Sequence, residues 1–248
     1  MPNPLQPIAQ AELFARLAEG HDARLTVLTP NARLAQALQR EFDRRQLAAG
    51  RTSWEAPDIL PFAAFVQRSY EEARFEADGE ALALPIGAAE AELLWEEAVR
   101  ASPWHGDLLS APAAAALAAE AWDLAHAWRI EGAIAGSGGS EDAQAFAAWC
   151  AHYRRRTEQD RLIDAARMPA ALAARLASGA TRPPAMLVLH GLELATPQQE
   201  DFLAACARAG AGLARTEPPS AAGSVRRVLR DSPRQEIERA ASWARARL

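Results

Sequence analysis

The residues best suited to binding chemistry lie at a turn between an apolar segment and an amphipathic one. Residues 24–42 read RLTVLTPNARLAQALQREF, which predicts a strand, a turn at Thr29-Pro30-Asn31 and a helix. In α/β enzymes, ligand phosphates commonly meet the helix N-terminus at such a turn. The chain contains no lysine, however, so a phosphate loop of the G-x-x-x-x-G-K-S/T kind is excluded at every position.

Other catalytic patterns are weak or missing. Asp160 and Asp164 are four residues apart and could share a helix face as a carboxylate pair, but no histidine or lysine partner accompanies them. Neither a G-x-S-x-G nor an H-E-x-x-H motif occurs, and Cys150 and Cys206 have no C-x-x-C spacing. We therefore predict no catalytic residue, no metal site and no cofactor for this chain.

Composition bounds the class of protein. Half of the 248 residues are apolar, which is enough for a sizeable core. The net charge of −5 argues against coating nucleic acid by bulk electrostatics, although local basic patches remain compatible with it. The sequence shows no signal peptide and no uninterrupted apolar run of membrane-spanning length. These features predict a cytoplasmic protein without a membrane segment.

Strand and helix patterns alternate at both ends of the chain, which predicts an α/β fold with a parallel sheet covered by helices on both faces. Residues 84–178 lack strand signals, so we expect an all-helical insertion there, and an α/β domain built from residues 1–83 and 179–248. The expected strands are 25–28, 56–60, 185–189, 212–216 and 224–229. The expected helices include 6–19, one beginning at 62, and one that a Thr196–Gln199 capping box opens.

Aromatic and basic residues gather in the expected insertion. Trp95, Trp122, Trp128 and Trp149 fall at apolar helical positions, which predicts core anchors. A run of arginines that includes Arg154 and Arg155 lies beside Tyr153 and Trp149, and charge next to stackable rings is typical of single-strand binders. A solvated helix face with Trp149 in the core is the simpler interpretation, and we prefer it.

Several segments together resemble a known family. VLTPNARLAQALQREF followed by WEAPDILPFAAFVQRSY is similar to the N-terminal region of AddB/RexB-like bacterial DNA repair proteins. These are PD-(D/E)XK nuclease family proteins related to superfamily 1 helicases. FAAWCAHYRRRTEQDRLIDAARMPAAL resembles their helical insertion, LVLHGLELATPQQEDFLAACARAG their Walker B region, and RDSPRQEIERAASWARARL the helix that follows it. The order and spacing of these degenerate segments carry the resemblance over nearly the whole chain.

The resemblance implies a RecA-like helicase fold without the motor. The segment before the strand, AELFARLAEGHDARL, has one glycine and no lysine where active relatives have the phosphate loop. The Walker B positions that should be Asp-Glu read His190 and Gly191. A neutral imidazole and a hydrogen atom do not replace two carboxylates that act through a magnesium ion. The resemblance therefore implies that this chain does not hydrolyse ATP.

What the resemblance leaves in place is contact with DNA. In superfamily 1 helicases the corresponding turn contacts the single-strand backbone, so Thr29, Asn31 and Arg33 are the expected contacts, through hydroxyl, amide and guanidinium groups. Helix capping by Thr29 or Asn31, with Arg33 as a solvated charge, explains the same residue types and is the preferred interpretation.

The expected function is a non-catalytic helicase-like domain of a DNA repair nuclease, which binds single-stranded DNA or acts as a scaffold. A protein-interaction module that organises a helicase–nuclease complex without touching DNA is the alternative, and the acidic charge favours it. The expected partners are single-stranded DNA, a C-terminal nuclease region of the same polypeptide and a helicase subunit. The last helix, predicted from 231, runs to Leu248 without a stop signal, which suggests a fragment of a longer polypeptide.

Overall fold

The computed structural model describes residues 5–75, 82–134, 139–217 and 227–246. Contacts divide the chain into two compact units, residues 1–217 and residues 218–248. The first unit contains all the strands of the described residues and nine of their α-helices, whereas α10 (Pro233–Arg245) belongs to the second. The expected α/β segment 179–248 is therefore divided after residue 217.

A five-stranded sheet forms the centre of the first unit, and all its neighbouring strands are parallel. Its strands, in spatial order, are β1 (Gln6–Ile8), β7 (Gly212–Thr216), β6 (Met186–Leu189), β2 (Leu25–Thr29) and β3 (Ile59–Pro61). The order differs from both common doubly wound arrangements. All five residues of β2 are buried, as expected for a central strand of a parallel sheet. The predicted parallel α/β class is confirmed.

The predicted elements agree with this sheet except where they are short. The strands near 25–28, 185–189 and 212–216 are confirmed, and the one expected at 56–60 is shifted to Ile59–Pro61. The helix expected over 6–19 was wrong at its start, because Gln6–Ile8 pairs with β7 as a strand. The strand expected at 224–229 lies partly outside the described residues, and its described part, 227–229, is not a strand.

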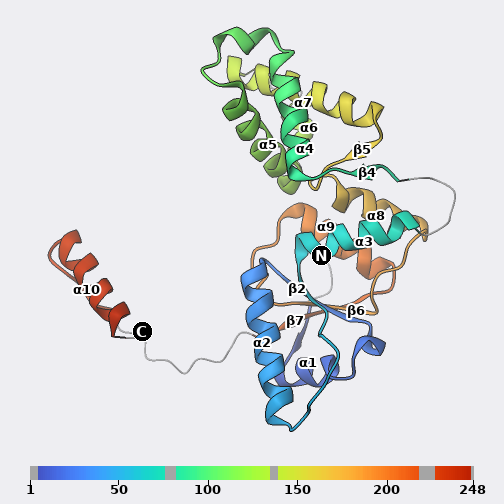
Figure 1. The fold of residues 1–248 in the computed structure, drawn as a ribbon, viewed down its shortest axis with the longest axis vertical. Coiled ribbons are helices and arrows are strands. Elements are labelled where there is room, and N and C mark those ends of the chain that lie inside the picture. The colour runs from blue at the N-terminus through green and yellow to red at the C-terminus, as the bar shows by residue number, and fades with distance from the viewer. Residues whose placement is uncertain (1–4, 76–81, 135–138, 218–226, 247–248) are drawn as a thin grey trace. The chain divides into compact units, whose positions relative to one another are not determined.

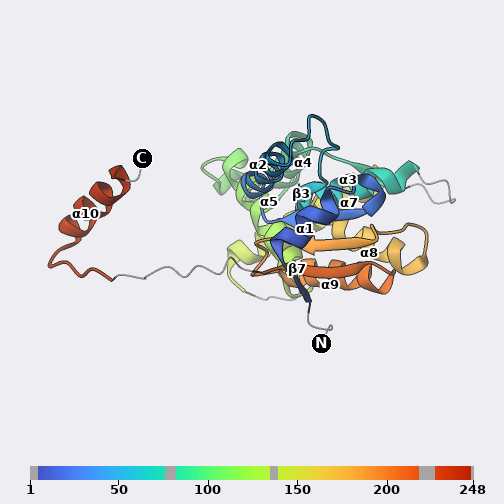
Figure 2. The ribbon, with the colours of Figure 1, turned by 90° about the horizontal axis from the view of Figure 1, so that it is seen from below.

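Helices cover both faces of the sheet. On one face are α1 (Gln10–Leu17) and α2 (Ala32–Ala48); on the other are α3 (Phe62–Phe75), α8 (Met168–Ser178) and α9 (Pro197–Arg208) (Figure 1). Strand β6 serves both faces, because Val188 packs with α1 and α2 while Leu187 and Leu189 pack with the other three helices. Helices α8 and α9 lie side by side (Figure 2).

The region between α3 and α8 is mainly helical but holds a second, two-stranded sheet. Its helices are α4 (Ala88–Arg100), the 3-10 helix η2 (Pro103–Asp107), α5 (Ala111–Trp128), α6 (Glu131–Ile134) and α7 (Glu141–Gln159). Strand β4 (Leu84–Pro85) pairs in parallel with β5 (Leu162–Ile163), so residues 84–178 are not all-helical. Two-residue strands are too short to show a periodic pattern in sequence. Leu172 and Leu176 of α8, moreover, belong to the core beneath the central sheet.

The helical region has its own aromatic core. Trp95, Trp122 and Tyr153 are almost fully buried, and Trp149 is also buried. Trp128 was predicted as a core anchor too, but 55% of it is exposed at the end of α5. The region is joined to α9 by an ion pair between Arg129 Nη1 and Asp201 Oδ2 at 2.6 Å.

Two further elements complete the described structure. Helix α10 begins at Pro233, and the hydroxyl of its N-cap, Ser232, accepts a hydrogen bond from the backbone N–H of Gln235, so the predicted capped start is confirmed. A 3-10 helix, η1 (His21–Ala23), leads into β2. Among the described residues, no helix has both the length and the apolar character needed to cross a membrane.

Candidate functional site

The carboxyl edge of the sheet has a topological switch point between β2 and β6. The chain leaves β2 through α2 toward β3, and leaves β6 through α9 toward β7, so the two connections cover opposite faces and run in opposite directions. In open α/β sheets, ligands bind in the crevice at such a point. Three neighbouring strands place a polar residue here, namely Thr29, His190 and Thr216.

Thr29 stabilises the turn after β2. Its side chain is fully buried, and its hydroxyl lies 3.0 Å from the carbonyl oxygen of Asn31 and 3.3 Å from that of Leu60. A hydroxyl has one proton, so these two acceptors share it. Thr29 therefore holds the turn against β3 and does not present its hydroxyl to solvent.

Asn31 and Arg33 lie on the outer side of the same turn. Asn31 is the N-cap of α2, and its Oδ1 accepts a 2.9 Å hydrogen bond from the backbone N–H of Leu34. Arg33, on the first turn of α2, is exposed and makes no hydrogen bond or ion pair with the described residues. Of the three predicted contacts, Arg33 alone has a side chain both exposed and uncommitted.

His190 is held in the sheet edge by a neighbouring strand. Its Nδ1 lies 3.0 Å from the hydroxyl oxygen of Thr216, and its backbone N–H donates to the carbonyl of Leu28. Burial lowers the pKa of His190, and the charge of Glu41 only partly opposes this effect. The imidazole is therefore neutral at pH 7 and already has a hydrogen-bond partner.

Gly191 closes the switch point. Its φ of +71° lies in the left-handed region, and a Cβ placed on it would be 2.5 Å from Cδ2 of Leu34 and 3.7 Å from Cδ of Pro30. The backbone of Gly191 thus lies directly against the first turn of α2. A side chain at position 191 would therefore require the end of the Leu34 side chain to move and would adopt an unfavourable backbone conformation.

Two arginines of α7 contact other side chains of the helical region. The guanidinium carbon of Arg154 lies 5.3 Å from the ring centroid of Trp122, and Arg155 Nη2 lies 3.2 Å from Nδ1 of His152. Tyr153 stacks on Trp95 with centroids 4.1 Å apart and is buried. The rings that could have stacked on DNA bases are core residues, in agreement with the preferred interpretation of this run.

The carboxylates of Asp160 and Asp164 do not form a pair on one helix face. Asp160 ends α7, and Arg161, with a φ of +56°, turns the chain into β5. Asp164 follows that strand, is buried, and accepts a 2.8 Å hydrogen bond from Nε of Arg167. The expected shared face was wrong because α7 ends at Gln159 and Asp160 is only its C-cap, so Asp164 lies beyond the helix.

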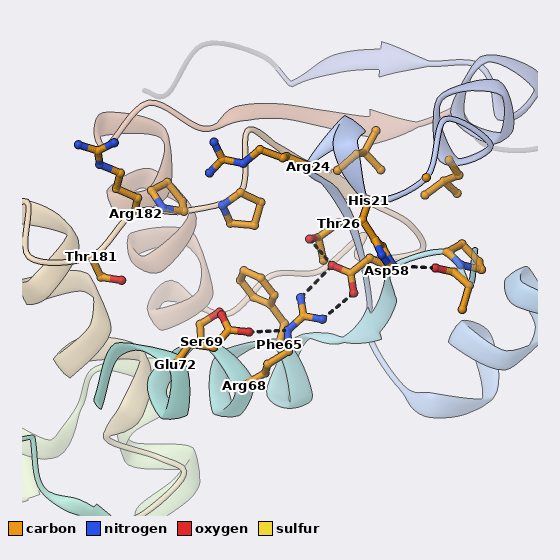
Figure 3. Close-up of a pocket in the computed structure, with 17 residues that line it drawn as sticks. His21, Arg24, Thr26, Asp58, Phe65, Arg68, Ser69, Glu72, Thr181 and Arg182 are labelled. Atoms are coloured by element: carbon orange, nitrogen blue, oxygen red, sulfur yellow. Dashed lines mark hydrogen bonds and ion pairs between the residues drawn. The ribbon is translucent and has the colours of Figure 1, made fainter. Parts of the chain in front are cut away.

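A pocket of about 420 Å³, which the sequence did not predict, lies at the opposite, amino edge of the sheet. Asp58 is one of the residues that line this pocket, and Figure 3 shows the hydrogen bonds that it accepts from Arg68 and Thr26. Arg68 donates two hydrogen bonds to the Asp58 carboxylate, at 2.6 and 2.8 Å, and the buried Thr26 hydroxyl donates a third at 2.6 Å. No sequence signal links these residues, because they come from β2, the segment before β3, and α3.

Known proteins supply no further assignment: no protein-family model and no curated protein matches this chain. Among the described residues there is also no group of three His, Cys, Asp or Glu side chains that could hold a metal ion.

Asp58 makes stability depend on acid pH. Burial alone would raise the pKa of Asp58, but the hydrogen bonds from Arg68 and Thr26, with the charge of Arg68, leave that pKa below its usual value. The ionised Asp58 carboxylate therefore stabilises the folded state fully above its pKa in the unfolded chain, about 3.9. This stabilisation is lost as the pH falls through the lower pKa that Asp58 has in the folded state. We expect Asp58→Asn to cost about 1–3 kcal/mol at pH 7, and the difference from wild type to shrink below about pH 4.

Urea unfolding of both proteins between pH 7 and pH 3 measures this effect. Glu72→Gln is the matched control, because its carboxylate lies 3.8 Å from Arg68 Nε and its side chain is 67% exposed. A cost for Asp58→Asn that stays constant down to pH 3 would contradict the assigned pKa direction.

Proposed function

We propose that this chain is a non-catalytic, RecA-like domain of a DNA repair nuclease, which binds single-stranded DNA without hydrolysing ATP. The observation that carries the proposal is Arg33, an exposed and uncommitted guanidinium on the first turn of α2, at the switch point of a parallel sheet. A guanidinium and the free N–H groups of a helix N-terminus together favour a phosphate.

The topology supports the helicase-like part of the proposal. The strand, turn and helix of residues 25–48 lie at the centre of the sheet, next to β6 with its His190-Gly191 end. The helical region lies between β3 and β6 in the chain, where the family resemblance places an insertion. This arrangement supports the proposal because it places the β2–α2 turn at an edge of a parallel sheet, where a helicase-like domain would contact DNA.

The local chemistry supports the absence of ATP hydrolysis. No lysine is available for the β and γ phosphates, and His190 and Gly191 provide no carboxylate for a magnesium ion. The polar groups that remain at this edge, Thr29 and His190, are engaged with the protein itself. A phosphate that binds at this edge would therefore contact the exposed side chain of Arg33 and not the buried residues of the sheet.

Replacing Arg33 with glutamine tests the DNA contact. Losing one phosphate contact should weaken binding of an oligo-dT strand about three- to tenfold. It should also make the plot of log affinity against log salt concentration less steep, by the amount that one phosphate contact contributes. Fluorescence anisotropy at several salt concentrations measures both quantities. Arg33→Gln is preferred to an Asn31 variant, because removing the Asn31 cap costs about 1 kcal/mol of stability by itself.

Arg40→Gln is the matched control. Arg40 is also an exposed arginine of α2, two turns further along the helix, and its replacement removes the same charge. Equal loss of affinity in the two variants would indicate bulk electrostatics, and unchanged affinity in Arg33→Gln would remove this residue from the site.

An exposed apolar stripe favours the alternative, a protein-interaction module that organises a helicase–nuclease complex. Leu117, Leu124 and Trp128 follow one side of α5 at helical spacing, with exposed fractions of 67%, 58% and 55%. Wild-type protein that shows no salt-dependent binding of oligo-dT would favour this second function over the first.

A further inference from the structure

Two arginines line the amino edge of the sheet, at the end opposite the β2–α2 turn. Arg24 immediately precedes β2, and Arg182 lies in the segment that leads into β6. Both residues line the pocket that contains Asp58, and both line an adjoining pocket of about 440 Å³. We call the combined space the amino-edge pocket; Figure 3 shows the first of the two pockets, with Arg24 and Arg182 labelled.

The positive charge of these two residues is not neutralised by the protein. Arg24 and Arg182 are exposed, and neither side chain makes a hydrogen bond or ion pair with the described residues. The lining of the adjoining pocket contains no carboxylate. Asp58 and Glu72 line the first pocket, but Arg68 contacts both of them. The amino-edge pocket therefore has an excess of positive charge.

The backbones that carry the two arginines are fixed. Arg24 adopts a φ of +46°, its N–H donates to the carbonyl of His21 at 2.9 Å, and its carbonyl accepts from the N–H of Met186 at 3.2 Å. Arg182 directly precedes Pro183, which disfavours helical backbone at Arg182 and favours extended backbone. An anion would therefore meet guanidinium groups whose attachment points are already ordered.

We propose that Arg24 and Arg182 bind a phosphate-bearing ligand in the amino-edge pocket. Guanidinium groups present paired N–H donors that match phosphate oxygens, and two such groups suit the charge of a pyrophosphate unit. Thr181, which also lines both pockets, adds a hydroxyl donor. The volumes fall within the range of small-ligand sites, about 300–1,000 Å³. This site goes beyond the DNA contact at Arg33 and lies at the other edge of the sheet.

Calorimetric titration of inorganic pyrophosphate into the whole chain tests the site. We expect wild type to bind, each of Arg24→Asn and Arg182→Gln to weaken binding about three- to tenfold, and the double variant to lose at least about tenfold. Asparagine is chosen at position 24 because it tolerates a positive φ. Arg40→Gln, an exposed α2 residue, should retain wild-type affinity.

Thermal unfolding without ligand establishes that the variants are folded, and the same pyrophosphate concentration should raise the melting temperature of wild type more than that of the double variant. An oligo-dT strand then identifies the source of the phosphate. If it displaces pyrophosphate and binds the double variant more weakly, the ligand is DNA backbone; if it does not compete, the ligand is a small phosphate compound. Absence of pyrophosphate binding by wild type, or equal binding by the double variant, would overturn the proposal.

Discussion

Replacing Gly191 with glutamate is expected to lower the free energy of unfolding by about 2–4 kcal/mol and to create no magnesium–ATP site. The strain arises from two sources. The φ of +71° is unfavourable for any side chain, and the new Cβ would lie 2.5 Å from Cδ2 of Leu34. Part of the second cost is relieved if Leu34 changes rotamer, because the contact is with the end of a flexible side chain.

Gly50→Glu is the matched control for this variant. Gly50 has nearly the same φ, +75°, but no atom lies within 4 Å of a Cβ built on it. We therefore expect a cost of about 1–2 kcal/mol there, from backbone strain alone. Urea unfolding measures both costs, and calorimetry with ATP and magnesium measures binding.

The double variant His190→Asp with Gly191→Glu extends the same test. It places two carboxylates where the proposed helicase-like domain would have its Walker B acids, yet the chain still lacks a lysine for the phosphates. ATP binding by the double variant, or equal costs for the Gly191 and Gly50 variants, would show that the switch point is more open than the Gly191–Leu34 contact implies.

Replacing Trp122 with alanine is expected to destabilise the helical region by about 3–5 kcal/mol. Trp122 is 2% exposed, and its ring meets Trp95 and Tyr153 edge to face at 5.7 and 5.6 Å. Arg154 also lies over this ring, so the substitution removes a cation–π contact together with the packing. The neighbouring helices cannot close the resulting cavity fully, because interiors are close-packed.

Trp128→Ala is the control, since Trp128 lies on the same helix but is largely exposed. Its replacement should cost less than about 1 kcal/mol. Hydrogen exchange would show where the loss acts, with faster exchange in α4, α5 and α7 than in β2 and β6 for Trp122→Ala. Equal costs for the two tryptophans would contradict the assignment of Trp122 as the centre of this core.

The proposed contacts make the two edges of the sheet chemically different. Arg33 lies outside a closed carboxyl edge, whereas Arg24 and Arg182 line a pocket at the amino edge. Arg33→Gln and the Arg24/Arg182 double variant therefore separate the DNA proposal from the phosphate-pocket proposal. Either can fail while the other stands, because no described residue belongs to both sites.

Long elements with strong local signals were predictable. The strand and helix of residues 25–48 and the capping box at Thr196 and Gln199 were correct, because apolar periodicity and capping residues act within a few positions of each other. The three-residue β1 and the two-residue β4 and β5 were missed, since such short strands depend on a distant partner for their hydrogen bonds.

The sequence by itself determined the parallel α/β class and, through the absence of lysine, which phosphate chemistry is excluded. Tertiary structure alone decided that Thr29 is buried in its turn and that Gly191 lies against Leu34. It also brought Arg24 and Arg182 to one pocket, although they are far apart in the chain. The periodicity of apolar residues in a sequence indicates which face of a helix or strand is buried. Only the pairing of parallel strands decides which distant segments lie at the same edge of the sheet.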